Sequence, residues 1–133
     1  MKKGILCAID FSASSKEALR WSIDLAKKLN HHLTILYIYR LLRPYHGEVV
    51  DMKKKIEDDA QKNFSELEKE LLIGKGVSYD FKTEVGFVAD RAKDHVKRNG
   101  VDLLVVGQKM NSSNKQSFDE LVAELQMPLV IVP

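Results

Sequence analysis

Residues 5–12 read Ile5-Leu6-Cys7-Ala8-Ile9-Asp10-Phe11-Ser12, an unbroken apolar run that leads into an acid and a serine. Three more short apolar runs follow along the chain, at Leu33–Ile38, Leu103–Val106 and Leu129–Val132. Runs of this length are typical of strands that are covered on both faces, as in a parallel sheet. The first run therefore predicts a central strand, with Asp10 at its carboxyl end.

Four segments between and after these runs repeat apolar residues every three or four positions, which predicts helices that each bury one face. Their apolar positions are Ala18, Trp21, Leu25 and Leu29 in the first, Val49, Met52, Ile56, Ala60, Phe64, Leu67 and Leu71 in the second, Ala89, Ala92 and Val96 in the third, and Phe118, Leu121, Val122 and Leu125 in the fourth. Capping boxes, in which a serine and a glutamate satisfy free backbone N–H groups, predict helix starts at Ser14 with Glu17 and at Ser117 with Glu120.

A fifth strand is predicted from alternation. Between Val77 and Val85, apolar or aromatic residues alternate with Ser78, Asp80, Lys82 and Glu84, so one face is expected to be wet. A strand with one wet face belongs at a sheet edge. The element order is then β-α-β-α-β-α-β-α-β, which predicts a doubly wound α/β domain with a parallel five-stranded sheet and right-handed crossovers.

The composition predicts one domain over residues 1–133. The chain has one Cys, and its 21 Lys+Arg and 19 Asp+Glu give a formal net charge of +2. A single Cys excludes a disulfide framework, and the balanced charge argues against a nucleic-acid partner. No apolar run approaches the roughly 18 residues that span a bilayer, and Met1-Lys2-Lys3 does not lead into a secretory signal. We therefore expect a soluble protein of a reducing compartment, the cytoplasm.

Polar residues follow the predicted strands at the edge where an open parallel sheet binds ligands, the carboxyl end at which the strand order reverses. Asp10 follows the first strand and is expected either to accept hydrogen bonds from a ligand or to close the turn into the first helix. The serines between Ser12 and Ser15 precede a helix start, which favours anions, although capping alone explains one of them. The polar loop from Asn111 to Ser117, beyond Gly107, also precedes a helix start but contains no glycine.

Several pieces of the sequence together carry a resemblance to a known family. They are Lys2 to Ser12 with the helix that follows, Leu33 to Tyr39, the step Glu84-Val85-Gly86, Val101 to Gly107, and Met127 to Pro133. The whole chain resembles a universal stress protein domain. The resemblance implies an adenine nucleotide alpha hydrolase-like fold, in which helices cover both faces of a sheet with strand order 3-2-1-4-5. That order agrees with the independent placement of 77–85 at an edge.

The resemblance also implies what a nucleotide site would need. Members that bind ATP carry the pattern Gly-x2-Gly-x9-Gly-Ser/Thr after the fourth strand, and an Asp at the end of the first strand. Asp10 matches the Asp and Gly107 the first glycine, but Met110 and Glu120 stand at the positions of the second and third. Ser117, the counterpart of the motif's serine, comes ten residues after Gly107 where the motif needs fourteen. The resemblance therefore implies a variant that lacks the glycine-rich loop.

Two hypotheses follow for the function. The first is a non-catalytic, dimeric stress-response domain with a degenerate nucleotide site and no cofactor, acting through contacts with an unidentified protein or through an unidentified small ligand. The second is an ATP-binding sensor or slow ATPase that uses Mg-ATP, with Asp10, Ile38, Gly107 and Ser117 lining the nucleotide crevice. We expect a homodimer through the last strand, Leu129–Val132, because an unpaired apolar edge invites association. Neither a membrane nor a nucleic acid is expected as partner.

The same residues argue against several other kinds of site. His31, His32, His46 and His95 lack metal-ligand spacing, and the first two are expected in the turn before the second strand. Cys7 is expected to be a buried structural thiol. A phosphorelay receiver would need an acidic pair at the first strand, and a flavodoxin-type site would need aromatic residues flanking a flavin. No Ser/His/Asp or Cys/His arrangement is apparent from the sequence alone.

Overall fold

The computed structural model describes residues 4–41, 49–110, 123 and 127–133. The predicted last helix, its capping box at Ser117 and Glu120, and the loop from Asn111 to Ser117 lie outside these residues, apart from Ala123. The described elements are β1 Gly4–Ile9, α1 Ala13–Leu29, β2 His32–Tyr39, α2 Val49–Leu67, the π-helical turn η1 Glu68–Leu72, β3 Tyr79–Val85, α3 Val88–Asn99, β4 Val101–Gly107 and β5 Leu129–Val132.

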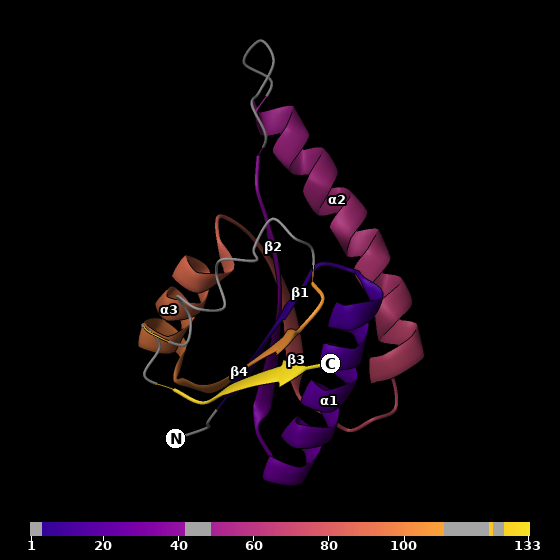
Figure 1. The fold of residues 1–133 in the computed structure, drawn as a ribbon. Coiled ribbons are helices and arrows are strands. Elements are labelled where there is room, and N and C mark those ends of the chain that lie inside the picture. Colours follow the sequence, from indigo (N-terminus) through magenta and orange to yellow (C-terminus); the bar gives the residue numbers. More distant parts are fainter. Residues whose placement is uncertain (1–3, 42–48, 111–122, 124–126) are drawn as a thin grey trace.

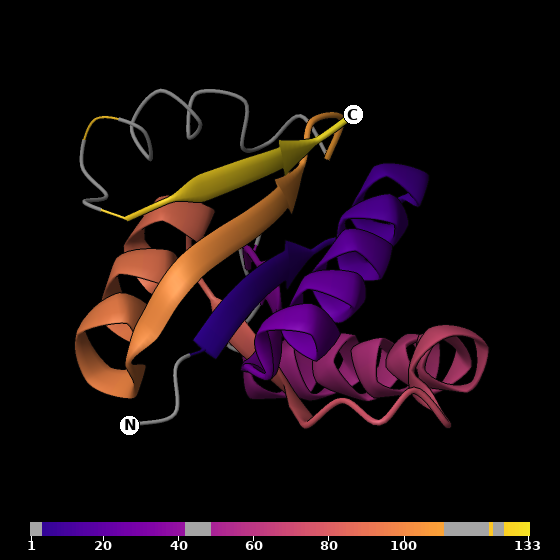
Figure 2. The same cartoon turned by 90° about the horizontal axis from the view of Figure 1, so that it is seen from below.

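The five strands form one parallel sheet in the order β3-β2-β1-β4-β5, which confirms the predicted fold class and the edge position of β3. Helices α1 and α2 lie on one face of this sheet and α3 lies on the other (Figures 1 and 2). The order along the sheet reverses between β1 and β4, so the switch point of the fold lies between the carboxyl ends of these two strands. Among the described helices, none is long and apolar enough to cross a bilayer.

The core consists of two apolar layers separated by the sheet. Successive side chains of a strand point to opposite faces, so Ile5, Cys7 and Ile9 pack against α1 and α2, whereas Leu6 and Ala8 pack against α3. All five are buried. The central position that the opening apolar run predicts for β1 is therefore confirmed.

The buried face of α1 is displaced from the predicted stripe. Trp21 is 55% exposed and Leu29 is also exposed, so their prediction as core residues is wrong. The residues that the helix buries are Ser15, Ala18, Leu19, Ser22, Ile23 and Ala26. Small residues dominate this face, and the Ser22 hydroxyl donates to the carbonyl oxygen of Ala18 at 2.8 Å. Hydrophobic spacing predicted that the large side chains are buried. The helix instead packs closely on the sheet, which favours small side chains at the contact.

The predicted capping box at Ser14 is also wrong. The residue that caps α1 is Ser12, whose hydroxyl accepts the backbone N–H of Ser15 at 3.2 Å. Glu17 forms an ion pair with Arg20, and the Ser14 hydroxyl accepts the N–H of Lys109 at 2.9 Å. Ser14 therefore lies inside α1 and bonds a residue far along the chain, whereas Ser12 caps the helix.

The α2 stripe is confirmed at its carboxyl-terminal end, where Ala60, Phe64 and Leu71 are buried. The helix continues into the π-helical turn η1, in which Ile73 N–H donates to the carbonyl oxygen of Glu68 at 3.0 Å. This wider turn places both Leu71 and Leu72 in the core.

The face of β3 that was predicted to be wet is wet only in part. Lys82 is exposed, but Glu84 Oε2 lies 2.8 Å from Nε2 of His95, a side chain of α3 that is only 2% exposed. The expectation of a wet Glu84 is therefore wrong, because α3 supplies a buried partner that alternation along one strand cannot reveal.

Candidate functional site

Asp10 closes a network of hydrogen bonds at the end of β1. Its Oδ1 accepts the backbone N–H of Ser12 at 2.9 Å, and its own N–H donates to the Ser15 hydroxyl at 3.2 Å. The same Ser15 hydroxyl donates to the carbonyl oxygen of Ser12 at 3.1 Å. Of the two roles that the sequence left open for Asp10, turn closure is therefore present in the structure. Asp10 is half-buried.

Phe11 adopts a left-handed backbone conformation with φ of 64°, which costs a non-glycine residue about 1 to 2 kcal/mol. Its ring lies 4.9 Å from that of Tyr37 and 6.4 Å from that of Phe81, measured between centroids. Burial, and then the nearby Asp10 carboxylate, raise the pKa of Tyr37. Aromatic packing on the α2 side therefore holds the turn in this conformation, a role that no local pattern in the sequence indicated.

The backbone N–H groups at the end of β4 and directly after it form hydrogen bonds within the chain. The N–H of Gly107 lies 3.3 Å from Sδ of Met110, and the N–H of Met110 donates to the carbonyl oxygen of Gly107 at 3.3 Å. Gln108 N–H donates to the carbonyl oxygen of Val132 at 2.7 Å, and Lys109 N–H donates to the Ser14 hydroxyl at 2.9 Å. All four consecutive N–H groups from 107 to 110 are therefore bonded within the chain.

Gly107 lies against the first turn of α1. A Cβ atom built on it would lie 2.4 Å from the Ser14 hydroxyl oxygen and 2.6 Å from the Ser14 carbonyl oxygen. No real Cβ atom tolerates such distances, so this position accepts only glycine while α1 keeps its place. The close approach of helix and strand explains Gly107 without any ligand.

The end of β2 is occupied by side-chain contacts. The Tyr39 hydroxyl donates to Oε2 of Glu57 at 2.6 Å, and burial together with this hydrogen bond raises the pKa of Tyr39. The Arg40 guanidinium lies over the Phe87 ring, 4.6 Å from its centroid, which is the geometry of a cation–π contact. Ile38 is buried on the α3 side of the sheet, so its side chain belongs to the core.

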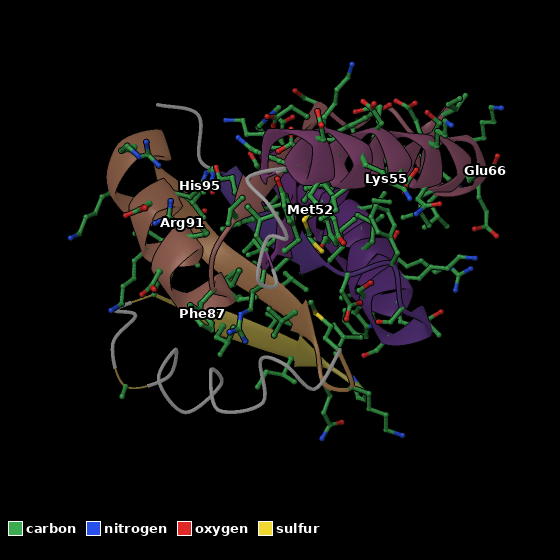
Figure 3. All side chains as sticks on the ribbon, turned by 90° about the horizontal axis from the view of Figure 1, so that it is seen from above. Met52, Lys55, Glu66, Phe87, Arg91 and His95 are labelled. Atoms are coloured by element: carbon green, nitrogen blue, oxygen red, sulfur yellow. The ribbon has the colours of Figure 1, made fainter. Side chains whose placement is uncertain are left out.

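The step Glu84-Val85-Gly86 carries the chain from β3 into α3. Gly86 has φ of 140°, a conformation that side chains rarely adopt, and its N–H donates to the carbonyl oxygen of Tyr39 at 2.9 Å. The Arg91 side chain packs directly on it, with Nε 3.4 Å from where a Cβ would stand. Figure 3 shows Phe87, Arg91 and His95 on the α3 side of the sheet, and Met52, Lys55 and Glu66 along α2 on the opposite side.

The family model described as the Universal stress protein family matches residues 1–133. The chain belongs to the universal stress protein family. Solved structures with the same fold include a family protein from Burkholderia pseudomallei, with 17% identity, a TM-score of 0.79 and coverage of 98% of this chain and 95% of that chain. The universal stress protein UspA from Lactobacillus plantarum has 15% identity, a TM-score of 0.79 and coverage of 98% and 97%.

A third family structure, from Arabidopsis thaliana and with AMP bound, has 18% identity, a TM-score of 0.65 and coverage of 98% of this chain and 90% of that chain. At these identities the likeness shows the fold alone. Among proteins with curated descriptions, no significant match was found.

For this universal stress protein domain, the register of the sheet brings three of the four predicted site positions to one end. Cys7 of β1 pairs with Val105 of β4, and Ile9 pairs with Tyr37 of β2, so Asp10, Ile38 and Gly107 all lie at the carboxyl ends of three neighbouring strands. Ser117 lies outside the described residues. The sequence singled out Ser14 and Met110 for other reasons, but their contacts with the backbone N–H groups of Lys109 and Gly107 depend on the fold.

Cys7 is fully buried in the stress-protein core, as predicted. Burial raises the pKa of its thiol to about 12, against the opposing effect of a hydrogen bond with Ser22. The thiol therefore stays protonated at neutral pH and is not a nucleophile, since the thiolate is the reactive form. Within the described part of the chain, no three His, Cys, Asp or Glu side chains gather as metal ligands would.

Proposed function

We propose that this universal stress protein domain is non-catalytic at its crevice, holds no nucleotide cofactor there, and acts through contacts with other proteins. The observation that carries the proposal is the internal use of all four backbone N–H groups from Gly107 to Met110. Phosphates in a loop after a strand are held by such N–H groups. A ligand phosphate at this place would have to displace Ser14, Val132 and Met110 from their bonds.

The sequence supports the same proposal. No glycine follows Gly107 anywhere in the chain, and the residue at the second glycine position of the ATP-binding pattern, Met110, lies against the α3-side core. A loop without glycine cannot easily adopt the close-approach conformations that a wrapped phosphate requires. The variant lacking the glycine-rich ATP loop is thus the form of the family that we assign to this chain.

The loss of these N–H donors is expected to weaken phosphate binding strongly. Each charge-assisted hydrogen bond that a phosphate forgoes costs about 1.5 to 3 kcal/mol. Losing two such bonds weakens binding by about 4 kcal/mol, or roughly 1,000-fold. An affinity that would be micromolar with a complete loop then becomes millimolar.

Isothermal titration calorimetry with Mg-ATP tests this proposal. We expect no saturable heat, with a dissociation constant weaker than about 1 mM, and no rise in melting temperature when Mg-ATP is added. A dissociation constant in the low micromolar range would contradict the proposal. Titrating Mg-AMP in parallel separates loss of the outer phosphates from loss of the whole site.

The second candidate function is a nucleotide sensor or slow ATPase. The specific observation in its favour is the AMP bound to the Arabidopsis thaliana family protein, and another family structure was solved in complex with cAMP. If the titration does give saturable heat, the same titration of Asp10→Ala decides where the ligand sits. Loss of the heat in Asp10→Ala would favour this candidate, because Asp10 lies at the switch point.

We also propose a homodimer through β5 and a cytoplasmic location. β5 is an edge strand of the described sheet, it is wholly apolar from Leu129 to Val132, and Ile131 is 41% exposed. An exposed apolar edge is a template for pairing with a second copy. The unpaired thiol of Cys7 is consistent with a reducing compartment.

Light scattering of the purified chain tests the dimer. We expect the mass of two chains at micromolar concentration, and the mass of one chain for Ile131→Lys, because a charge at the paired edge would have to be buried without a partner. Ile73→Lys is the matched control, since Ile73 is exposed but lies between η1 and β3, away from β5. A mass of one chain for the unsubstituted protein would rule the dimer out.

A further inference from the structure

Three polar side chains meet at the end of the sheet opposite the crevice. His32 is the first residue of β2, Ser78 directly precedes β3, and Asp80 is the second residue of β3. The parallel register pairs Leu33 with Tyr79 and Thr34 with Asp80. Because side chains two residues apart share a face of a strand, this register brings all three side chains to the same face of the sheet. The expectation that His32 lies in the turn before β2 is wrong, because His32 is the first residue of the strand.

The hydrogen bonds run in the order serine, histidine, aspartate. Nδ1 of His32 lies 2.7 Å from the Ser78 hydroxyl, and Nε2 lies 2.7 Å from Oδ1 of Asp80. A carboxylate can only accept a hydrogen bond, so Nε2 of His32 carries the hydrogen and donates the hydrogen bond to Asp80. Nδ1 of the neutral ring is then left with a lone pair, which accepts the hydrogen of the Ser78 hydroxyl.

The carboxylate is itself held in place. Oδ1 of Asp80 also accepts the Thr34 hydroxyl at 3.1 Å, and the Lys82 ammonium lies 3.8 Å from Oδ2. These contacts fix the group that orients the imidazole. A nucleophile within hydrogen-bond reach of a base, and a base oriented by a third group, is the arrangement that activates serine in acyl-transfer enzymes.

The serine is open to solvent. Ser78 is exposed, and the side chains of His32 and Asp80 are 33% and 37% exposed. A small molecule can therefore reach the Ser78 oxygen without any movement of the fold.

One backbone donor lies next to the serine. The Ser78 carbonyl oxygen accepts Leu33 N–H at 2.9 Å, so it points toward β2. The described peptides are trans, and in a trans peptide the following N–H points the opposite way. The N–H of Tyr79 therefore points to the open side of β3, which is an edge strand of the described sheet. The N–H of the residue after the nucleophile is also one of the oxyanion-hole donors in α/β-hydrolases.

We propose that Ser78 is an acyl-accepting serine, with His32 as its general base and Asp80 as a positioning residue, and that its substrates are small activated esters. In the reaction the Ser78 oxygen forms a bond to the acyl carbon, and the bond from that carbon to the leaving alcohol oxygen breaks. His32 Nδ1 takes the serine proton and passes it to the leaving oxygen or to water. This modification site is separate from the crevice and does not depend on the proposed function.

The experiment treats the full chain with p-nitrophenyl acetate, follows release of p-nitrophenol by absorbance, and locates acetyl groups by peptide mass spectrometry. We expect a fast phase of one equivalent and an acetyl group on Ser78. Ser65 is the matched control, because it is partly exposed and its hydroxyl donates to a backbone carbonyl oxygen, that of Gln61 at 3.0 Å, rather than to a histidine. Ser78 should react about 100-fold faster than Ser65, since a positioned general base contributes at least that much.

The variants separate chemistry from structure. Ser78→Ala and His32→Ala should each lose the fast phase, and added imidazole should restore part of it in His32→Ala, which a purely structural role of His32 would not allow. Asp80→Asn preserves the shape of the side chain but loses the correct tautomer of His32, so Ser78 acetylation should slow by at least about tenfold. Ser65 acetylation and the melting temperature should stay unchanged. Acetylation of Ser78 no faster than that of Ser65, or an unchanged rate in Asp80→Asn, would overturn the proposal.

Discussion

Gly107→Val is expected to lower the free energy of unfolding by about 3 kcal/mol or more, at the upper end of the range for overpacked sites. The Cβ position lies 2.4 Å from the Ser14 hydroxyl oxygen and 2.6 Å from the Ser14 carbonyl oxygen. The second of these is backbone in the first turn of α1, so relief requires the helix to move away from β4. Urea unfolding followed by circular dichroism measures the change.

Three further variants make this result specific. Gly4→Ala is the matched control, because its Cβ would meet its nearest neighbour, the His32 carbonyl oxygen, at an ordinary 3.6 Å, and its stability should change by less than about 1 kcal/mol. Ser14→Ala combined with Gly107→Ala should recover only part of the loss of Gly107→Ala, since the backbone clash remains. Full stability of Gly107→Val would mean that helix and strand do not approach as described.

Phe64→Ala is expected to lower the free energy of unfolding by about 4 kcal/mol, the central value for deleting a buried aromatic ring. Phe64 is 3% exposed, and its ring stacks on that of Phe81 with 4.1 Å between centroids and 2° between planes. The pair joins α2 to the edge strand β3. Its removal leaves a cavity between the two elements and forfeits the stacking interaction. Urea unfolding followed by circular dichroism is again the measurement.

Trp21→Ala is the control for that variant. It deletes a larger aromatic side chain, but one that is 55% exposed, so the loss should stay within about 1 kcal/mol. Equal losses in the two variants would contradict the assignment of Phe64 to the core and of Trp21 to the surface.

The strands were predictable because their signal is local. The apolar runs at 5–9 and 103–106 and the alternation at 77–85 each mark a strand without reference to any other part of the chain. Helix positions followed in the same way from the spacing of apolar residues. The buried face of α1 followed only at Ala18, because a close approach to the sheet favours Ser22 over Trp21, and hydrophobic spacing does not predict that preference.

The position of the candidate site was predictable from the sequence, but the hydrogen bonds of its residues were not. Topology places Asp10 and Gly107 at the switch point, and this much follows from strand order. What those residues do depends on atoms contributed from elsewhere. The N–H of Lys109 donates to Ser14 Oγ, and the N–H of Gln108 donates to the carbonyl oxygen of Val132. Our proposal on phosphate binding therefore depends on hydrogen bonds between distant segments of the chain.

The fold class, the central place of β1 and the edge place of β3 follow from residue types and their order along the chain, and so does the absence of glycine beyond Gly107. The folded chain was needed to show that Ser12 rather than Ser14 caps α1, that Glu84 faces a buried His95, and that His32 lies between Ser78 and Asp80. The hydrogen-bonded pairs Glu84–His95, His32–Ser78 and His32–Asp80 are 11, 46 and 48 residues apart in the sequence. Hydrogen bonds act over about 3 Å, so contacts of this kind exist only once the register of the sheet has brought the strands together.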